Sequence, residues 1–417
     1  MSAKLNIIII TESIEVNDSS ASKGRVALIQ NLHKAGFQLK IYHYTRKPMA
    51  LEGIACVAIK EQKGTLNYFL SKAQLLLKRF LGLNANQWVE KQFGFSFAFF
   101  NDSYSIIKAL QKENPENFDW ILTLSKAASF RPHKALLGLP QWHDKWLAYI
   151  HDPYPMHFYP RPYTWVEPGY YQKQEFFREV SKKAAFGVFP SKLLQEWMGS
   201  YYPDFLERGI VIPHQISENE IKTNSTLPTY FDAKKFTILH AGSLMKQRDP
   251  KGLVEGYALF LKKHPKAAAQ TQLLFLGNND YHAPYLNAQG AAIPSLYVSK
   301  GYVAYESVRA MQQEASVNVI LEAKAEISPF LPGKFSHCIQ VEKPILHLGP
   351  TLSETRRLLG NAYPYTAEID AVQSIANHLH TLYDNWQQTK QQPPVAYADL
   401  KAYLGVNHLR DTLLNLT

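Results

Sequence analysis

The sequence predicts an α/β protein built from two facing, doubly wound, Rossmann-like domains. Apolar runs rich in β-formers alternate with helical patterns, and the same alternation restarts in the second half of the chain. Strands buried on both faces of a parallel sheet appear as unbroken apolar runs, which is the pattern here. A chain of 417 residues with 46% hydrophobic residues can fill sizeable cores in two or three domains. Disordered and fibrous classes are therefore excluded.

The strands expected in the first half follow one another at spacings that leave room for helices between them. They are Leu5–Ile10, Leu39–His43, Trp120–Leu124, Leu147–Ile150 and Phe186–Phe189. Between the first two strands, Val26–Ala35 carries apolar residues at helical spacing, and Gly36 follows as a typical helix stop.

The second half repeats this order of strand and helix. Its expected strands are Phe236–His240, Gln272–Leu276, Ser295–Val298, Val317–Leu321 and Pro344–Leu348. Between the halves, Ile210–His214 leads into Ser217–Pro228, which is polar and has little periodicity. We therefore expect an N-terminal domain over residues 1–212 and a C-terminal domain that begins at residue 213.

Composition limits the compartment and the partners. Lys and Arg total 45 against 35 Asp and Glu, and this net charge of +10 favours anionic partners such as phosphate groups, acidic lipid or nucleic acid. Cys56 and Cys338 are too few for a disulfide framework and are not clustered with histidines as zinc ligands would be, so a reducing compartment is expected. The apolar run near the N-terminus is too short for a signal peptide, and no stretch approaches the roughly 20 apolar residues that span a bilayer. We expect a cytoplasmic protein, at most peripheral to the inner face of the membrane.

Neither half contains the Gly-x-Gly-x-x-Gly fingerprint or a Walker A loop, which argues against an ordinary nicotinamide domain or a P-loop enzyme. Doubly wound domains bind ligands outside the carboxyl ends of their strands. Candidate functional residues should therefore directly follow the predicted strands, in a cleft between the two domains.

Two such segments lie in the first half. Small residues and Gly24 lead into the first helix, where backbone N–H groups suit a phosphate or an anionic transition state; an ordinary surface loop is the alternative. His151 follows the fourth strand, where it could hydrogen-bond a substrate hydroxyl or carbonyl while Asp152 orients it; a structural histidine is the alternative.

Two further segments lie in the second half. Gly242 allows a close backbone approach after the strand ending at His240, and Arg248 offers a planar fork of donors that matches phosphate oxygens. Lys334 falls in the first turn of a predicted helix, where the dipole disfavours a cation unless it meets an anion. For both cations, a solvated surface loop is the alternative.

The order and spacing of these segments resemble the retaining GT-B glycosyltransferases of the family 4 type, over most of the chain. The matching pieces are Tyr149–Asp152, Phe189–Leu193, Val211–His214, Ala241–Ser243 with Arg248–Pro250, Gly301–Ser307, and Ser328 through Lys343–Ile345. The resemblance implies a C-terminal domain, residues 213–394, that binds a nucleotide-diphosphate sugar. It also implies that the N-terminal domain binds the acceptor and is joined by the final helix, at about residues 395–417.

The resemblance also implies roles for individual residues. Arg248 and Lys334 would hold the diphosphate, Gly301–Val303 with Tyr302 would lie under the base, and His151 would reach the sugar. Donor contacts would also come from Gly24, Gly242, Ser243, Ser328 and Val303. Such enzymes usually work without a metal, and no cofactor is implied beyond the donor substrate.

One departure from the family concerns a pair of glutamates. Members often carry two glutamates separated by seven residues across this helix start, and the corresponding positions here are Pro329 and His337. Histidine can still hydrogen-bond a ribose hydroxyl. The sugar contact would then fall to Glu326 or to the backbone amides of Phe330 and Leu331.

The function that these observations predict is a hexosyltransferase acting on a carbohydrate or lipid-linked acceptor, in surface polysaccharide or glycoconjugate biosynthesis. The alternatives are a nucleotide-sugar epimerase on the same fold and a non-catalytic protein that binds carbohydrate or nucleotide, since a fold does not settle function. No carboxylate pair for glycoside hydrolysis is apparent, and no nucleic-acid-binding motif is present.

Residues 68–81 combine a helical apolar pattern with the cations Lys72, Lys78 and Arg79. A basic amphipathic helix of this kind can lie on an anionic membrane surface. The favoured alternative is an ordinary helix whose leucine face packs on the core, because the apolar residues outnumber what one interfacial face needs.

Overall fold

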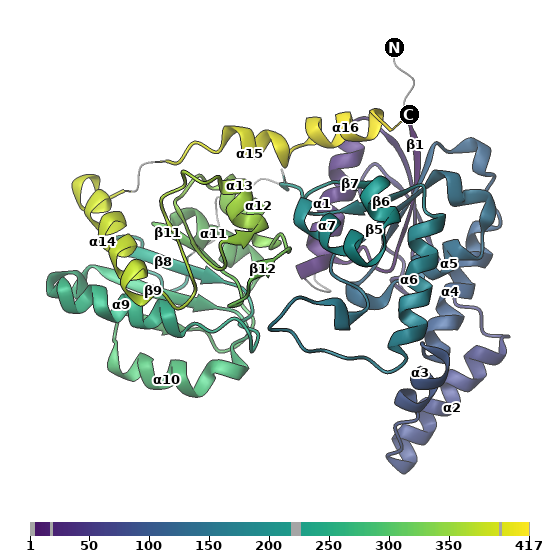
Figure 1. The fold of residues 1–417 in the computed structure, drawn as a ribbon, viewed down its shortest axis with the longest axis horizontal. Coiled ribbons are helices and arrows are strands. Elements are labelled where there is room, and N and C mark those ends of the chain that lie inside the picture. Colours follow the sequence, from purple (N-terminus) through teal and green to yellow (C-terminus); the bar gives the residue numbers. More distant parts are fainter. Residues whose placement is uncertain (1–4, 17–19, 218–226, 392–393, 417) are drawn as a thin grey trace. The chain divides into compact units, whose positions relative to one another are not determined.

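The computed structural model describes residues 5–16, 20–217, 227–391 and 394–416, and the chain divides into two compact units (Figure 1). Unit 1 comprises Met1–Tyr159, Tyr163–Gln215 and Gly405–Thr417. Unit 2 comprises Pro160–Pro162 and Ile216–Leu404. Most of the polar stretch predicted between the domains, Ser217–Pro228, lies outside the described residues. The chain enters unit 2 after Gln215 and returns to unit 1 at Gly405, whereas the sequence suggests residues 212 and about 395.

Unit 1 is a seven-stranded parallel sheet in the order β3-β2-β1-β4-β5-β6-β7. The strands are β1 (Asn6–Thr11), β2 (Gln38–His43), β3 (Ala55–Ala58), β4 (Trp120–Leu124), β5 (Trp146–Tyr149), β6 (Phe186–Phe189) and β7 (Gly209–Val211). The helices are α1 (Ser20–Lys34), α2 (Leu66–Leu81), α3 (Asn86–Phe93), α4 (Phe97–Leu110), α5 (Arg131–Leu137), α6 (Tyr170–Lys183), α7 (Lys192–Tyr201), α8 (Asp204–Glu207) and α16 (Val406–Leu414).

The unbroken apolar run of β1 arises because both faces of this sheet are covered. Ile7 and Ile9 belong to a core cluster that includes leucines of α1 and α16, whereas Ile8 and Ile10 belong to a second cluster with residues of α4, α5 and α6. Successive side chains of a strand point to opposite faces, so all four isoleucines are fully buried. The isoleucine run thus reflects a strand with a hydrophobic core on each side.

Unit 2 has a six-stranded parallel sheet in the order β10-β9-β8-β11-β13-β15, and β12 and β14 form a separate parallel pair. The strands are β8 (Phe236–Ala241), β9 (Thr271–Leu276), β10 (Leu296–Val298), β11 (Val317–Leu321), β12 (Ile327–Ser328), β13 (Ile345–Leu348), β14 (Leu352–Ser353) and β15 (Thr366–Ala367). The helices are α9 (Lys251–Lys263), α10 (Ala283–Ala292), α11 (Tyr305–Glu314), α12 (Lys334–Gln340), α13 (Glu354–Leu359), α14 (Val372–Thr389) and α15 (Ala398–Tyr403).

The unit 2 sheet is also covered on both faces. Ile238 and Phe275 pack in a cluster with residues of α9 and α14, whereas Leu239 and Leu274 pack in another cluster with Met311 of α11. A further cluster joins α12 and α15 to Ile320 of β11 and other residues. Both sheets are therefore doubly wound, as the sequence predicts.

Every strand expected from the sequence is present, with ends shifted by no more than a residue or so, but short strands without a long apolar run were not expected. These are β3, β7, β12, β14 and β15. The first helix begins at Ser20, whereas the sequence indicates Val26. The apolar periodicity does not reveal the first turns because their residues are mostly polar. None of the helices among the described residues is long and apolar enough to cross a membrane.

The expectation that the leucine face of α2 packs on the core is wrong. The leucines Leu75, Leu76 and Leu77 are exposed, and the buried residues of this helix are Ser71 and Gln74. The polar side of α2 therefore faces unit 1, where α2 packs against α4.

Close packing around α9 gives a stability prediction. An added β-carbon at Gly252 would lie 2.0 Å from the carbonyl oxygen of Ile369, a rigid backbone atom. We expect Gly252→Ala to lower the free energy of unfolding by about 1–3 kcal/mol, measured by urea denaturation. The control is Gly290→Ala in α10, where the nearest atom would lie 3.9 Å away. That variant should gain about 0.5–1 kcal/mol from helix propensity. Equal stability of the two variants would contradict the packing described here.

Candidate anion-binding and catalytic sites

Each unit places its candidate residues near the point where the strand order reverses. In unit 1 the reversal lies between β1 and β4, and in unit 2 between β8 and β11. Loops leave in opposite directions from the carboxyl ends of two such neighbouring strands and open a crevice, which is where doubly wound sheets bind ligands. The segments that follow β1, β4, β8 and β11 are therefore the first to examine.

In unit 2, the amine of Lys334 meets the end of β8. Lys334 Nζ lies 2.9 Å from Nε2 of His240, which is 1% exposed. An ammonium can only donate, so the imidazole accepts this hydrogen bond in its neutral form. The other ring nitrogen of His240, Nδ1, is buried and has no partner among the described residues.

The backbone after β8 leaves space for this amine. Gly242 has φ of +143°, a conformation that favours glycine, and a β-carbon there would lie 3.3 Å from Lys334 Nζ. A hydrogen bond to β9 holds this turn in place: the N–H of Gly242 donates to the carbonyl of Leu276, the last residue of β9, at 2.8 Å. Ser243, which follows, is exposed.

Arg248 adds a second positive charge to this part of unit 2. Its side chain is half-buried, and its Nε is buried with no hydrogen-bond partner among the described residues. Burial and, to a lesser extent, the charge of Arg248 lower the pKa of Lys334 to about 7. Burial also holds the pKa of His240 well below its usual range, with Lys334 and Arg248 contributing.

This cluster, Lys334, His240 and Arg248, is suited to bind an anion. A bound phosphate would stabilise the charged form of Lys334 and would offer acceptors to both cations. The same charges repel each other when no anion is bound. The structure therefore brings together two residues that the sequence singled out separately, and adds His240.

A buried carboxylate, that of Glu322, contacts the segment before α12, the helix that carries Lys334. Glu322, directly after β11, is 4% exposed; Thr355 Oγ1 donates to its Oε1 at 2.6 Å, and His347 Nε2 lies 3.5 Å from the same oxygen. Although burial alone would raise the pKa of Glu322, these hydrogen bonds lower it. The charge of Glu322 raises the pKa of Lys334 and so partly opposes the effect of Arg248.

His337, at one position of the family glutamate pair, already has a partner. Its Nε2 lies 3.0 Å from the hydroxyl of Tyr305, which also accepts a hydrogen bond from Arg309 at 3.3 Å. Pro329, at the other position, is buried. A ribose contact through His337 would therefore share the imidazole with Tyr305.

The remaining unit 2 residues that the sequence singled out differ in exposure. Tyr302 is 76% exposed and Glu326 is also exposed, whereas Val303 and Phe330 are half-buried. Ser328 and Leu331 are buried, and Ser328 hydrogen-bonds to Glu322. Ser328 and Leu331 therefore help to hold the segment before α12 in position.

In unit 1, His151 lies beside His214. The two rings stack with centroids 6.3 Å apart, and the ring of Tyr149 lies 4.6 Å from that of His151. His151 Nε2 is buried and has no hydrogen-bond partner among the described residues. Burial, then the nearby His214 and Arg25, hold the pKa of His151 well below its usual range. A neutral imidazole of this kind can accept or donate one hydrogen bond to a substrate.

Gly24 and Arg25 of α1 lie close to His214 and His151. A β-carbon at Gly24 would lie 4.0 Å from Nδ1 of His214. Arg25 is 1% exposed and donates to the carbonyl of Ser125 at 3.0 Å, which ties α1 to the end of β4. Asp152 is half-buried, and its orienting role stays a prediction.

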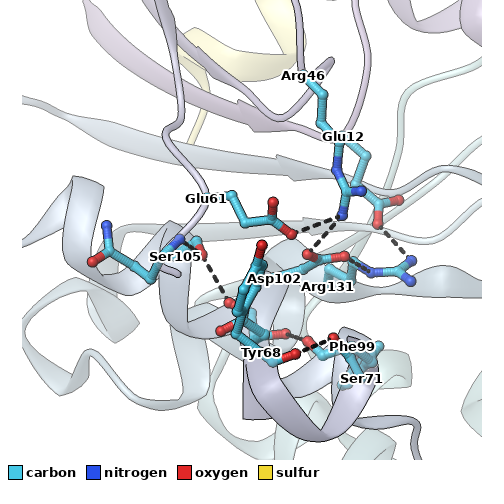
Figure 2. A network of polar contacts seen from close by, with 12 residues as sticks. Glu12, Arg46, Glu61, Tyr68, Ser71, Phe99, Asp102, Ser105 and Arg131 are labelled. Atoms are coloured by element: carbon cyan, nitrogen blue, oxygen red, sulfur yellow. Dashed lines mark hydrogen bonds and ion pairs between the residues drawn. The ribbon is translucent and has the colours of Figure 1, made fainter. Parts of the chain in front are cut away.

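A network of ion pairs fixes the loops at the strand reversal of unit 1 (Figure 2). The carboxylate of Glu12, directly after β1, accepts hydrogen bonds from the Lys126 backbone and the Ser129 hydroxyl, and lies 3.3 Å from Arg131. Asp102 of α4 pairs with Arg131 at 2.9 Å and with Arg46 at 3.0 Å. These contacts tie the segments after β1, β2 and β4 to α4.

Sequence reasoning missed the partner residues of both sites. His240 lies at the carboxyl end of β8 and His214 shortly after β7, so their positions at strand ends, the signal that singled out His151, could have found them. Glu322 carries no such signal, because its role depends on His347 and Thr355, which are distant in sequence.

Comparisons with known proteins give structural matches only. No protein-family model matches the chain, and no curated protein matches it in sequence. A glycosyltransferase from Rickettsia africae matches with a TM-score of 0.56 and 13% identity, over 99% of this chain and 94% of that chain. HepE from Anabaena, solved with UDP and glucose, matches with a TM-score of 0.58 and 11% identity, over 99% and 98%. A UDP-forming alpha,alpha-trehalose-phosphate synthase from Burkholderia xenovorans matches with a TM-score of 0.62 and 12% identity, over 99% and 98%.

The chain has the GT-B fold. The likeness spans nearly the whole of each chain, and both parallel α/β sheets are included. The identity is too low to carry a function across to this chain.

The lowered pKa of Lys334 can be tested directly. We expect one dimethyl-lysine signal, in NMR spectra of the reductively ¹³C-methylated protein, to titrate with a midpoint near pH 7, because this amine is buried beside a second cation. The signal should be absent in Lys334→Met, and its midpoint should rise in Arg248→Met. Titration of every lysine signal well above pH 9 would contradict the arrangement.

Proposed function

We propose that this protein is a glycosyltransferase that moves a sugar from a nucleotide-diphosphate sugar to a carbohydrate or lipid-linked acceptor. We further propose that it is a retaining, metal-independent hexosyltransferase similar to family 4. The observation that carries the proposal is the cluster of Lys334, His240 and Arg248 at the carboxyl edge of the unit 2 sheet. On a GT-B fold, this cluster has the charge and burial that a diphosphate requires.

Catalysis would come chiefly from stabilising the departing diphosphate. When the anomeric C–O bond breaks, its electron pair goes to the diphosphate oxygen, and negative charge develops there. Lys334 and Arg248 would meet this charge with hydrogen bonds, in a buried setting that strengthens electrostatic interactions. His240 would hold the Lys334 amine in place, because the buried imidazole of His240 accepts a hydrogen bond from that amine.

We assign donor binding to unit 2 and acceptor binding to unit 1. Tyr302 is the side chain of the 301–303 turn that is free to lie against a nucleobase, since it is 76% exposed. In unit 1, the buried and unoccupied Nε2 of His151 is suited to one hydrogen bond with the transferred sugar. The solved structures of HepE with UDP and glucose and of the UDP-forming synthase support a uridine nucleotide as the first donor base to test.

The first prediction concerns the diphosphate. Removal of a charged hydrogen-bond donor costs about 1.5–3 kcal/mol, so Arg248→Ala and Lys334→Ala should each weaken binding of UDP, GDP or ADP at least about tenfold. Calorimetric titration of the tightest of the three measures this loss. Lys266→Ala, an exposed lysine of unit 2, is the control and should bind as the wild type does. If both site variants keep wild-type affinity, the diphosphate is not held by this cluster.

The second prediction concerns His151. A contact that strengthens in the transition state affects turnover more than ground-state binding. We expect His151→Ala to lower kcat by about 10²-fold or more while nucleotide affinity stays unchanged. Sugar transfer is measured by product analysis with and without acceptor, and the exposed His33→Ala serves as the control. Full activity of His151→Ala would make this histidine structural, and conversion of the donor without any acceptor would favour an epimerase.

A further inference from the structure

Helix α2 is inverted relative to an ordinary surface helix of a globular protein. Such a helix buries its apolar side and exposes its polar side. In α2 the buried residues are Ser71 and Gln74, while Phe69 is 62% exposed, Leu76 54% and Phe80 74%. Phe69, Leu76 and Phe80 are spaced by seven and four residues, so they share one face, opposite the buried one.

The polar side of α2 packs against α4. Thr65 caps the helix by accepting from the Tyr68 N–H at 3.0 Å and also hydrogen-bonds to Asn101 of α4. Within α2, Ser71 Oγ donates to the Tyr68 carbonyl at 2.7 Å, which satisfies this buried hydroxyl (Figure 2). The outward position of the apolar face therefore follows from the docking of the helix on α4.

The next helix, α3, also exposes large apolar side chains. Trp88 is 62% exposed and Phe93 is 52% exposed, whereas Val89 is buried. Helix α3 is anchored near α6 by an ion pair from Lys173 to Glu90 at 3.7 Å. Both helices lie at one end of unit 1 (Figure 1). Apolar groups exposed over two consecutive helices exceed the scattered single residues that a monomer surface normally shows.

Cations accompany these apolar side chains. Lys72, Lys78 and Arg79 are exposed, and α2 contains no acidic residue. Among the described residues, none of the ion pairs involves these three cations; Lys72 instead lies 5.0 Å from the Tyr68 ring. A positive, apolar surface with an exposed tryptophan has the features of a membrane-surface helix.

We propose that α2 and α3 form a surface that docks unit 1 onto an anionic lipid bilayer, with Phe69, Leu76, Phe80 and Trp88 entering the interface and Lys72 and Arg79, which flank the apolar face of α2, meeting the head groups. We refer to these six residues as the α2–α3 surface. A second copy of the chain is a poorer occupant. A twofold contact through this face would bring Lys72 and Arg79 close to their own counterparts, with no acidic residue on α2 to compensate. This inference does not depend on the enzymatic proposal.

The test is co-sedimentation of the full chain with vesicles of phosphatidylcholine alone or with about 30% phosphatidylglycerol, at about 0.05 and 0.5 M salt. We expect binding to the anionic vesicles at low salt and much weaker binding to the neutral ones. Lys72→Gln and Arg79→Gln together should reduce the partition coefficient at least about tenfold. Phe69→Ser, Leu76→Ser and Phe80→Ser together should reduce it as strongly, because the apolar groups enter the interface.

Matched variants separate this surface from the overall charge of the protein. Lys263→Gln and Lys266→Gln remove the same charge from exposed positions of unit 2, and Val166→Ser, Leu206→Ser and Leu352→Ser remove exposed apolar side chains elsewhere. Both controls should bind vesicles as the wild type does. Equal losses in a control and in its matched site variant would overturn the proposal. An absence of binding to anionic vesicles would also overturn the proposal. If the protein then forms a dimer that dissociates in Phe80→Ser, a second copy of the chain covers this surface instead.

Discussion

The parallel arrangement of every strand is the constraint on which both candidate sites depend. Parallel strands place all their carboxyl ends on one edge of the sheet, and a reversal of strand order opens a crevice there. His240 and Gly242 occupy that edge in unit 2, as Glu12 and His151 do in unit 1. Such a sheet is stable only when both faces are covered, which is why β1 is a run of isoleucines with a separate core on each side. The apolar strands and the polar residues that follow them are thus two consequences of one architecture.

The two units stabilise their edge loops in different ways. Unit 1 uses matched ion pairs, in which Glu12 and Asp102 neutralise Arg131 and leave little unbalanced charge. Unit 2 instead brings Lys334 and Arg248 near each other, with the carboxylate of Glu322 as a partial counterweight. An uncompensated positive site costs stability unless an anion enters it. This difference is the physical reason to assign the anionic part of the substrate to unit 2.

The long strands could be predicted from sequence, because unbroken apolar runs carry a strong signal, whereas the GT-B fold was expected from the resemblance of the segments that follow them to a known family. β12 and β14, only two residues each, carry none. Lys334 and Arg248 could be singled out from their places in the chain, whereas the contact between Lys334 and His240 could not, since these two residues are far apart in sequence. The orientation of α2 was predicted wrongly for a related reason. Its leucines suggest a core helix, and only the burial of Ser71 and Gln74 in the folded structure shows that the apolar face points outward.

The most direct test of the central claim is a crystal structure of the protein with a bound nucleoside diphosphate. We expect a phosphate oxygen within about 3 Å of Lys334 Nζ and within hydrogen-bond reach of the Arg248 guanidinium, with Gly242 in contact with the diphosphate. A diphosphate bound elsewhere, with the hydrogen bond between Lys334 and His240 unchanged and no anion beside it, would show that this cluster is not the diphosphate site.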